Sequence, residues 1–219
     1  MSAAERRRFR DAILELNRRY YTVNGQRDAV SIWFKQDQVH QATHVHQQAS
    51  FLPWHRKLIN EFERQLQEID PTLGLHYWDW TTDPRATPNG RGGFVDLMTA
   101  EFLGGSSGGA GSPLLEADFY RRTPLNRYID ESGRPRRAPP FPADLPPIVI
   151  TRVVQGGPLQ VSSDTDIAGV SARPGLELER FWRALIVAHG IIHRTYLGGT
   201  LGPDHMSFED PGCSCCTPT

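Results

Sequence analysis

Apolar residues recur at intervals of three and four along several stretches of the chain, which is the spacing that one face of an α-helix presents to a core. The first stretch predicts a helix over about residues 3–20. A turn signal at Asn24-Gly25 follows it, and helical spacing resumes near residue 28. Two helices joined by a tight turn are therefore expected at the start of the chain.

Two further helices are predicted. One follows Ser50, a residue type that favours helix N-caps, and ends near Asp70 because Pro71 disfavours the α conformation of the residue before it. The other covers about residues 176–198, where Gly198 supplies the stop. Four residues of this last stretch share one helical face: Leu185, His189, Ile192 and Tyr196.

The part between about residues 81 and 175 lacks helical periodicity. It is rich in glycine and serine over 104–113 and in proline over 133–147, and the apolar run 148–154 is typical of a short strand. Because a structureless segment of this length is unusual in a compact domain, we expect a loop-rich excursion around a helical core, with a second small subdomain as the alternative. The expected fold class is mainly α, a four-helix bundle core with long irregular loops and little strand.

The composition is that of a globular protein and excludes several classes of partner. Hydrophobic residues make up 38% and charged residues 22% of the 219 residues, and the net charge is −1. Neither a nucleic-acid partner nor a membrane is expected, since the sequence lacks a basic cluster with aromatic platforms and a long apolar run. The N-terminal stretch does not read as a signal peptide, which favours a cytoplasmic location by default.

All three cysteines lie within the last seven residues of the chain: Cys213, Cys215 and Cys216. No cysteine elsewhere could pair with them, so a disulfide framework for the fold is excluded. We expect a single domain over 1–211 and a divergent, frayed tail over 212–219.

The eight histidines carry the most distinctive chemistry. His189 and His193 are four residues apart, so on a helix both side chains project from one face and can bind the same metal ion. The pair alone is weak evidence, because ordinary core or surface histidines show the same spacing. A zinc-peptidase site would need glutamate after the first histidine, and Gly190 occupies that position.

Four more histidines lie close to the start of the predicted third helix: His40, His44, His46 and His55. His55 falls on the apolar face of that helix, where a buried imidazole needs a partner such as a metal ion. Neither cysteine nor interleaved carboxylates accompany the cluster. Ligation by imidazole nitrogen favours copper, zinc, iron or nickel over calcium and magnesium.

The segment around these histidines, HVHQQASFLPWHRKLINEFERQL, resembles the first copper-site signature of tyrosinases, catechol oxidases and molluscan hemocyanins. In that signature a histidine is followed nine residues later by another inside F-x-P-W-H-R, as His46 and His55 are here. LHYWDWTTDP (75–84) resembles the family's Y-W-D-W segment, and HGIIHRTYLGG (189–199) resembles the start of its second copper site. Because the three landmarks occur in the family's order, the chain is identified as a member of this family.

The resemblance implies a binuclear site of two copper ions, each held by three histidines, with O2 as co-substrate. It assigns His46 and His55 to the first copper, and His189 and His193 to the second. The remaining ligand of the first copper comes from the preceding helix, where His40 and His44 are both candidates and periodicity does not decide between them. We favour His40, because the family places this ligand in a helix that ends before the loop.

The third histidine of the family's second site, which follows a D-P-x-F-x-x-x-H stretch, has no counterpart here. The chain reads SFEDP over 207–211 and then GCSCCTPT. A truncated or frame-shifted gene product, a shortened chain and a divergent site are the three explanations, and we favour the first two. His205 is a candidate substitute ligand, although a histidine at the pocket rim is the favoured interpretation. We therefore expect an incomplete second site and fewer than two bound coppers.

The expected function is copper-dependent oxidation of o-diphenols to o-quinones by O2. Gly190 stands where the tyrosinases proper commonly have an asparagine that is associated with monophenols, so oxidation of o-diphenols or o-aminophenols is favoured over monophenol hydroxylation. The alternatives are a hemocyanin-like O2 carrier and an inactive remnant that binds one copper. The expected partners are a phenolic substrate and O2, and a copper-delivery protein is a further candidate.

Overall fold

The computed structural model describes residues 2–43, 45, 46, 48–76, 78–105, 114, 150, 152, 153, 177–202 and 207–213. The described helices are α1 (Ala3–Arg18), α2 (Ile32–Ala42), α3 (Phe51–Gln67) and α6 (Glu177–Ile191), with a π-helical segment η1 (Ile192–Leu197) and two 3₁₀ turns, η2 (Gly199–Leu201) and η3 (Ser207–Glu209). The strands form two antiparallel hairpins: β1 (Tyr20–Val23) with β2 (Gln26–Ser31), and β3 (Thr87–Pro88) with β4 (Phe94–Val95). The predicted fold class, mainly α with four helices and little strand, is confirmed.

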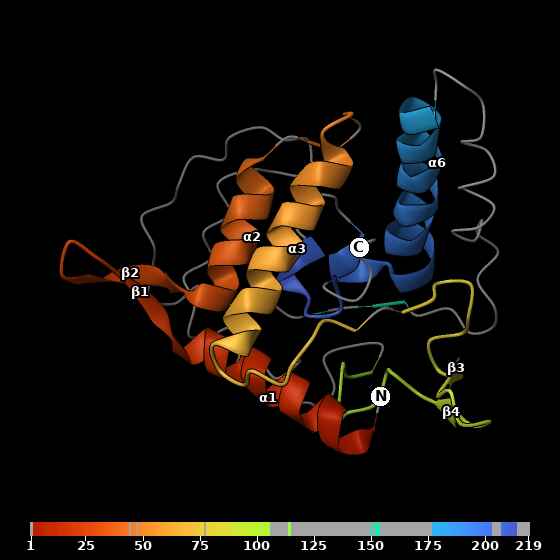
Figure 1. The fold of residues 1–219 in the computed structure, drawn as a ribbon, viewed down its shortest axis with the longest axis horizontal. Helices are drawn as coiled ribbons and strands as arrows, with labels where there is room; N and C mark the ends of the chain where they lie inside the picture. Colours follow the sequence, from red (N-terminus) through yellow and green to blue (C-terminus); the bar gives the residue numbers. More distant parts are fainter. Residues whose placement is uncertain are drawn as a thin grey trace.

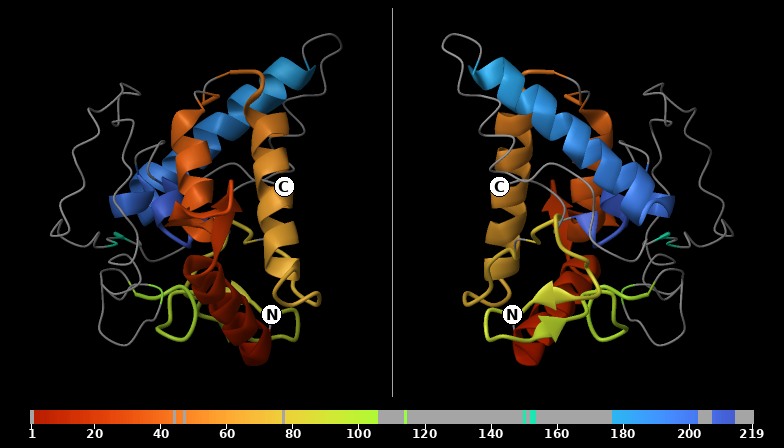
Figure 2. Two further views of the ribbon diagram at one scale, coloured as in Figure 1. Left: turned by 90° about the vertical axis from the view of Figure 1, so that its left-hand side faces the viewer. Right: turned by 90° about the vertical axis from the view of Figure 1, so that its right-hand side faces the viewer.

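The helices are arranged around one apolar core. α2 and α3 lie side by side, α1 passes across one end of the pair, and the β1–β2 hairpin projects away from it (Figure 1). α6 lies on another side and crosses the pair obliquely (Figure 2). The core contains Phe9 from α1, Trp33 from α2 and Phe62 from α3, all fully buried, and the rings of Trp33 and Phe62 are 5.6 Å apart.

α1 illustrates why the predicted periodicity produces a helix. Its start is capped reciprocally: the Ser2 hydroxyl accepts a hydrogen bond from the Glu5 N–H, and the Glu5 carboxylate accepts one from the Ser2 N–H. The face that contains Phe9, Ile13 and Leu16 is buried, and each such side chain stabilises the fold by roughly 1.5–3 kcal/mol. The prediction of a helix over 3–20 is therefore confirmed to within two residues.

The second helix begins later than predicted. Residues 26–31 form a strand instead of the first turn of a helix, because they pair with β1 across the turn at Asn24 and Gly25, whose φ angles are 51° and 76°. α2 then begins at Ile32, capped by Ser31, whose hydroxyl accepts a hydrogen bond from the Phe34 N–H. The local hairpin pairing therefore overrides the helical spacing at the start of this stretch.

α3 begins where the sequence predicts, but Ser50 does not cap it. Ser50 is itself in the α conformation, and its side chain makes no capping hydrogen bond. Pro53 lies in the first turn, where its missing N–H costs no helical hydrogen bond. The helix ends at Gln67. Three residues later a turn begins, in which the Asp70 carboxylate accepts hydrogen bonds from the N–H and the hydroxyl of Thr72.

The last helix continues from an α-helix into a π-helical segment at its C-terminal end. α6 gives way to η1 after Ile191, and the N–H of Gly198 donates to the carbonyl of His193 over 2.8 Å. The predicted stop at Gly198 is confirmed and has a structural reason: its φ is 54°, and a Cβ there would lie 2.7 Å from Val153 Cγ2. Tyr196, placed on the inner face by its spacing, packs against the core.

Much of the predicted loop-rich excursion over 81–175 lies outside the described residues. This applies to the proline-rich run 133–147 and to most of the run 148–154, for which a strand is predicted. The described part, 81–105, consists of turns and the small β3–β4 hairpin. Within the described residues, no helix has the length and apolar character that a membrane span requires.

Candidate metal centre

Three histidines converge from α2, α3 and the loop that joins them. His40 lies in the last turn of α2, His46 in the loop and His55 in the second turn of α3. One ligand nitrogen from each ring lies within 4.8 Å of those from the other two. Nitrogen ligands bound to one ion at about 2.1 Å lie roughly 3–4 Å apart, so small rotations of the rings complete the coordination. The three residues fit a metal ion that prefers imidazole.

The structure places His40, the favoured candidate for the third ligand of this group. His40 is 2% exposed and its ring centroid lies 4.9 Å from that of His46 and 5.6 Å from that of His55. His44 lies outside the described residues. The preference for His40 as the third member of this group therefore agrees with the geometry of the described residues.

His55 is oriented by its own helix. Its Nδ1 donates a hydrogen bond to the carbonyl of Phe51, one turn earlier, over 2.9 Å, and a carbonyl can only accept, so the proton is on Nδ1 and Nε2 is the ligand atom. Burial lowers the pKa of His55 from 6.5 to about 4, and nearby His46 and His193 lower it further, against the effect of the backbone hydrogen bond. The ring is therefore neutral at pH 7, the form that binds a metal.

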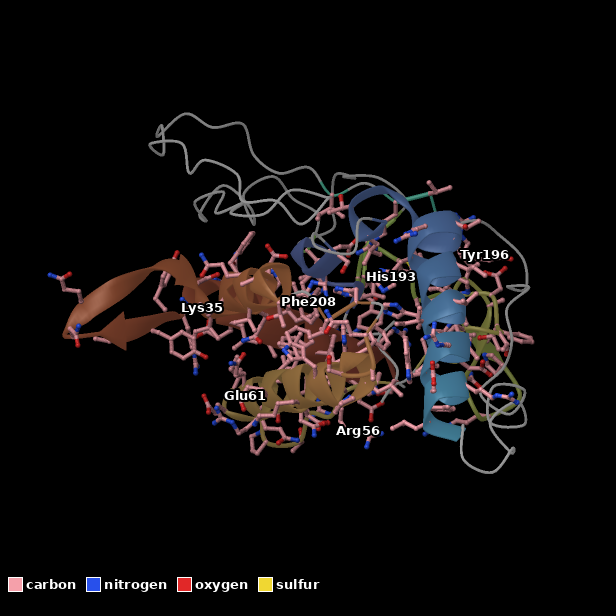
Figure 3. The ribbon with its side chains drawn as sticks, turned by 90° about the horizontal axis from the view of Figure 1, so that it is seen from above. Lys35, Arg56, Glu61, His193, Tyr196 and Phe208 are labelled. Atoms are coloured by element: carbon pink, nitrogen blue, oxygen red, sulfur yellow. The ribbon has the colours of Figure 1, made fainter. Side chains whose placement is uncertain are left out.

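The second group consists of His189 and His193, with ring centroids 4.3 Å apart. Nδ1 of His193 donates to the carbonyl of Leu201 over 2.8 Å, which again leaves Nε2 as the ligand atom. Burial, followed by the neighbouring imidazoles, lowers the pKa of His189 well below its usual value. The pair that was ambiguous by spacing alone is therefore a closely placed pair of imidazoles. Figure 3 shows His193, in η1, on the side of the α6–η1 segment that faces α2 and α3.

The two groups meet across α3 and α6. The rings of His55 and His189 are 6.3 Å apart, and Phe51 lies against both, at 4.3 Å from His55 and 5.3 Å from His189. The five histidines predicted as ligands thus form one continuous cluster. His205, the candidate substitute ligand, lies outside the described residues.

A pocket of about 350 Å³ opens onto this cluster. His46 and His189 line it, one from each group, together with Phe51, Ile186 and Gly190. A Cβ placed on Gly190 would meet no atom within 4 Å, so the glycine leaves open space beside His189. A flat aromatic ligand that enters here meets apolar walls and both histidine groups.

Several neighbours of the cluster were not predicted as part of the site. The ring of Phe208 in η3 lies 5.2 Å from that of His40 and is fully buried. A buried ion pair between Arg152 and Asp210 holds the same segment. Cys213, expected in a frayed tail, is 2% exposed, and its thiol donates to the Ser207 hydroxyl. The only sequence signal for these residues was the Asp210-Pro211 pair, which matches the family's D-P motif. The others could not be predicted, because contacts between distant segments produce no local periodicity.

A mainly helical core that brings two groups of histidines together at one pocket is the arrangement of a histidine-ligated metalloprotein. Residues 17–212 match the family model described as the common central domain of tyrosinase. The chain belongs to the tyrosinase family.

Individual relatives agree with this assignment. The chain is 34% identical over 145 residues to a tyrosinase of Streptomyces antibioticus, which covers 63% of this chain and 49% of the relative. It is 34% identical over 143 residues to a tyrosinase of Streptomyces glaucescens, covering 63% of this chain and 48% of the relative. A grixazone synthase of Streptomyces griseus is 33% identical over 127 residues, covering 56% of this chain and 38% of the relative. The chain matches about half or less of the length of these relatives.

Proposed function

We propose that this chain carries the copper centre of an oxidase that converts o-diphenols to o-quinones with O2. The observation that carries the proposal is the approach of the His40–His46–His55 group to the His189–His193 pair, with His55 and His189 only 6.3 Å apart. Copper, when bound, supplies the one-electron redox chemistry that imidazole side chains lack. In the overall reaction two diphenols each lose two electrons and two protons, and one O2 takes them up to form two waters.

The residues of the chain hold and orient the metal ions. His40, His46 and His55 would hold one copper, and His189 and His193 would contribute two ligands to the other. The backbone carbonyl of Phe51 accepts a hydrogen bond from Nδ1 of His55, and that of Leu201 accepts one from Nδ1 of His193. These bonds orient the two rings and leave Nε2 of each available as the ligand atom. Burial lowers the pKa of His55 to about 4 and the pKa of His189 well below its usual value, which favours the neutral form that binds a metal.

The pocket supports a phenolic substrate. Phe51 and Ile186 offer apolar surface to an aromatic ring, while His46 and His189 bring both histidine groups to the same opening. The open space at Gly190 admits a ring with two adjacent substituents and offers no side-chain amide to a single hydroxyl. We therefore infer oxidation of o-diphenols or o-aminophenols in preference to hydroxylation of monophenols. This access also favours the enzyme over a carrier that only binds O2.

A copper titration combined with catechol oxidation tests the proposal. The copper-free protein should bind copper and then consume O2 in the presence of catechol. The variant His55→Ala should lose the copper of the first group and the activity, with helix content retained in the circular dichroism spectrum. His76→Ala is the matched control, because His76 is a half-buried histidine that contacts Phe9 outside the cluster. Full copper loading in the His55 variant would show that the ligand assignment is wrong.

A further inference from the structure

A buried ion pair lies beside both histidine groups without belonging to either. The side chains of Arg152 and Asp210 are 1% and 0% exposed. Nε of Arg152 donates to Oδ2 of Asp210 over 2.6 Å, and Nη2 donates to Oδ1, so the pair is bidentate. Removing two charges from water is costly, and a buried pair is weak evidence of a gain in stability. Its geometry points instead to a role in fixing the segments that it joins.

The arginine joins segments that are far apart in the sequence. Besides its bond to Asp210, Nη1 of Arg152 donates to the carbonyl of Leu103 over 2.6 Å. The N–H of the next residue, Val153, donates to the carbonyl of Leu197 at the end of η1 over 2.7 Å. Residues 152 and 153 therefore connect the end of the loop 97–103, the end of the histidine-bearing helix, and the segment that follows η3.

One line of contacts leads from the pair to His193. A Cβ on Gly212 would lie 3.1 Å from Oδ1 of Asp210, 3.4 Å from Nη2 of Arg152 and 3.5 Å from Cδ1 of Leu201, so the pair and Leu201 meet around this glycine. The carbonyl of Leu201 is the acceptor that orients the His193 ring. The ion pair therefore lies next to Leu201, the residue whose carbonyl directs His193.

A second line of contacts leads to His40. The N–H of Asp210 donates to the carbonyl of Ser207 over 3.2 Å, which holds the turn η3 together. Phe208 in this turn, labelled in Figure 3, is fully buried. Its ring lies 5.2 Å from that of His40. The turn therefore supports the α2 side of the first histidine group.

We propose that the Arg152–Asp210 pair is a positioning element that sets the two histidine groups relative to each other, acting on His193 through Leu201 and on His40 through Phe208. The consequence for copper affinity rests on the function proposed above, whereas the effect on His193 is a property of the copper-free protein. Neither residue contacts the reacting atoms, so both act through the histidines.

The first measurement uses copper-free protein labelled with ¹⁵N. In the double variant Arg152→Met/Asp210→Leu, which removes both charges together, the Nδ1–H signal of His193 should shift and exchange with water faster, because the segment that holds its acceptor opens more readily. The Nδ1–H signal of His55 is the internal control, because its acceptor, the Phe51 carbonyl, lies in the same helix. An unchanged His193 signal would overturn the proposal.

The second measurement is the affinity for copper, followed by quenching of tryptophan fluorescence. Trp54 is a suitable reporter, since its ring lies 4.8 Å from that of His55. The double variant should bind copper about 10–100-fold more weakly, the range seen when residues behind metal ligands are lost. Leu66→Ala is the matched control: Leu66 is fully buried near the far end of α3, so this variant loses stability without touching the cluster. Equal losses of affinity in both would show a general effect of instability and overturn the proposal.

Two outcomes need a further comparison. If the double variant does not fold, Arg152→Lys decides, because lysine keeps the charge but not the planar fork that reaches Asp210 and Leu103 together. It should show faster exchange at His193 and weaker copper binding, and wild-type values of both would refute the role of the pair. If the wild-type chain binds no copper, the proposed function fails, and the exchange at His193 alone decides the positioning role.

Discussion

At the scale of single residues, the ligand histidines differ in how they are held. His55 is fixed by Phe51 within its own helix, a contact that follows from helical spacing. His193 is fixed by Leu201, which lies beyond the end of its helix. The residue identities therefore determine which rings can bind metal, while their orientation depends on backbone groups with no sequence signature of their own.

Gly190 offers a test of substrate choice at this scale. The variant Gly190→Asn should fold normally, because a Cβ there meets no atom within 4 Å and the helix propensities differ by less than about 1 kcal/mol. The amide adds a hydrogen-bonding group to the apolar pocket, so we expect the ratio of monophenol to diphenol activity to rise. Steady-state assays with paired substrates measure this ratio. Gly190→Ala is the control that fills space without the amide, and an equal rise in both variants would contradict the explanation.

His76 provides a prediction about pH and stability. Burial lowers the pKa of His76 below its ordinary value of 6.5. The unfolded chain therefore binds this proton more readily than the folded chain. The free energy of unfolding is not reduced by His76 above about pH 6.5, and it falls as the pH drops from there through the lower folded-state pKa. Urea unfolding of the copper-free protein between pH 7 and 4 should therefore show a shallower loss of stability in His76→Leu. Parallel pH profiles for the variant and the wild type would refute this.

At the scale of elements, the histidine-bearing segments have unequal support. α2 and α3 are adjacent helices joined by the short loop that contains His46. The α6–η1 segment instead depends on a tight passage at Gly198, next to Val153. The positions of His189 and His193 therefore depend more strongly on the neighbouring backbone than those of the first group.

Gly198→Ala tests this passage. With φ of 54° and ψ of −161° the position favours glycine, and the added Cβ would lie 2.7 Å from Val153, so we expect a loss of about 2–4 kcal/mol in the free energy of unfolding. Gly92→Ala, with φ of 79° but open space, should lose only about 1 kcal/mol. The double variant Gly198→Ala/Val153→Ala should recover part of the loss if the contact contributes to it. Urea denaturation of the four proteins measures these differences, and equal losses at both glycines would exclude the close contact as a cause.

At the scale of the whole molecule, the centre forms only because α6 crosses the α2–α3 pair. The described residues supply three imidazoles to one group and two to the other. The two sites are therefore expected to differ in copper affinity, even though they share one pocket.

Competition with a chelator should reveal this difference as two steps of copper binding. The first equivalent should bind more tightly, because three nitrogen ligands are already close together. His189→Ala should weaken the second step and leave the first in place, whereas His40→Ala should weaken the first. Two equivalent sites in the wild-type chain, or the loss of both steps in His189→Ala, would contradict the separation into two groups.

The sequence by itself determined the helices whose apolar spacing is regular and the ligand candidates that lie within short motifs. α1 and α3 follow from local periodicity, and His46 and His55 follow from a signature in which spacing and helix position are both specified. Such features are readable because their causes lie within one or two helical turns.

Only the tertiary structure decided the remaining features. His40 joined His46 and His55 because α2 lies beside α3, and His189 came close to His55 because α6 crosses that pair. The role of the Arg152–Asp210 pair likewise depends on segments that meet only after folding. Contacts between distant segments leave no period in the sequence, and their energies arise only when the chain is compact.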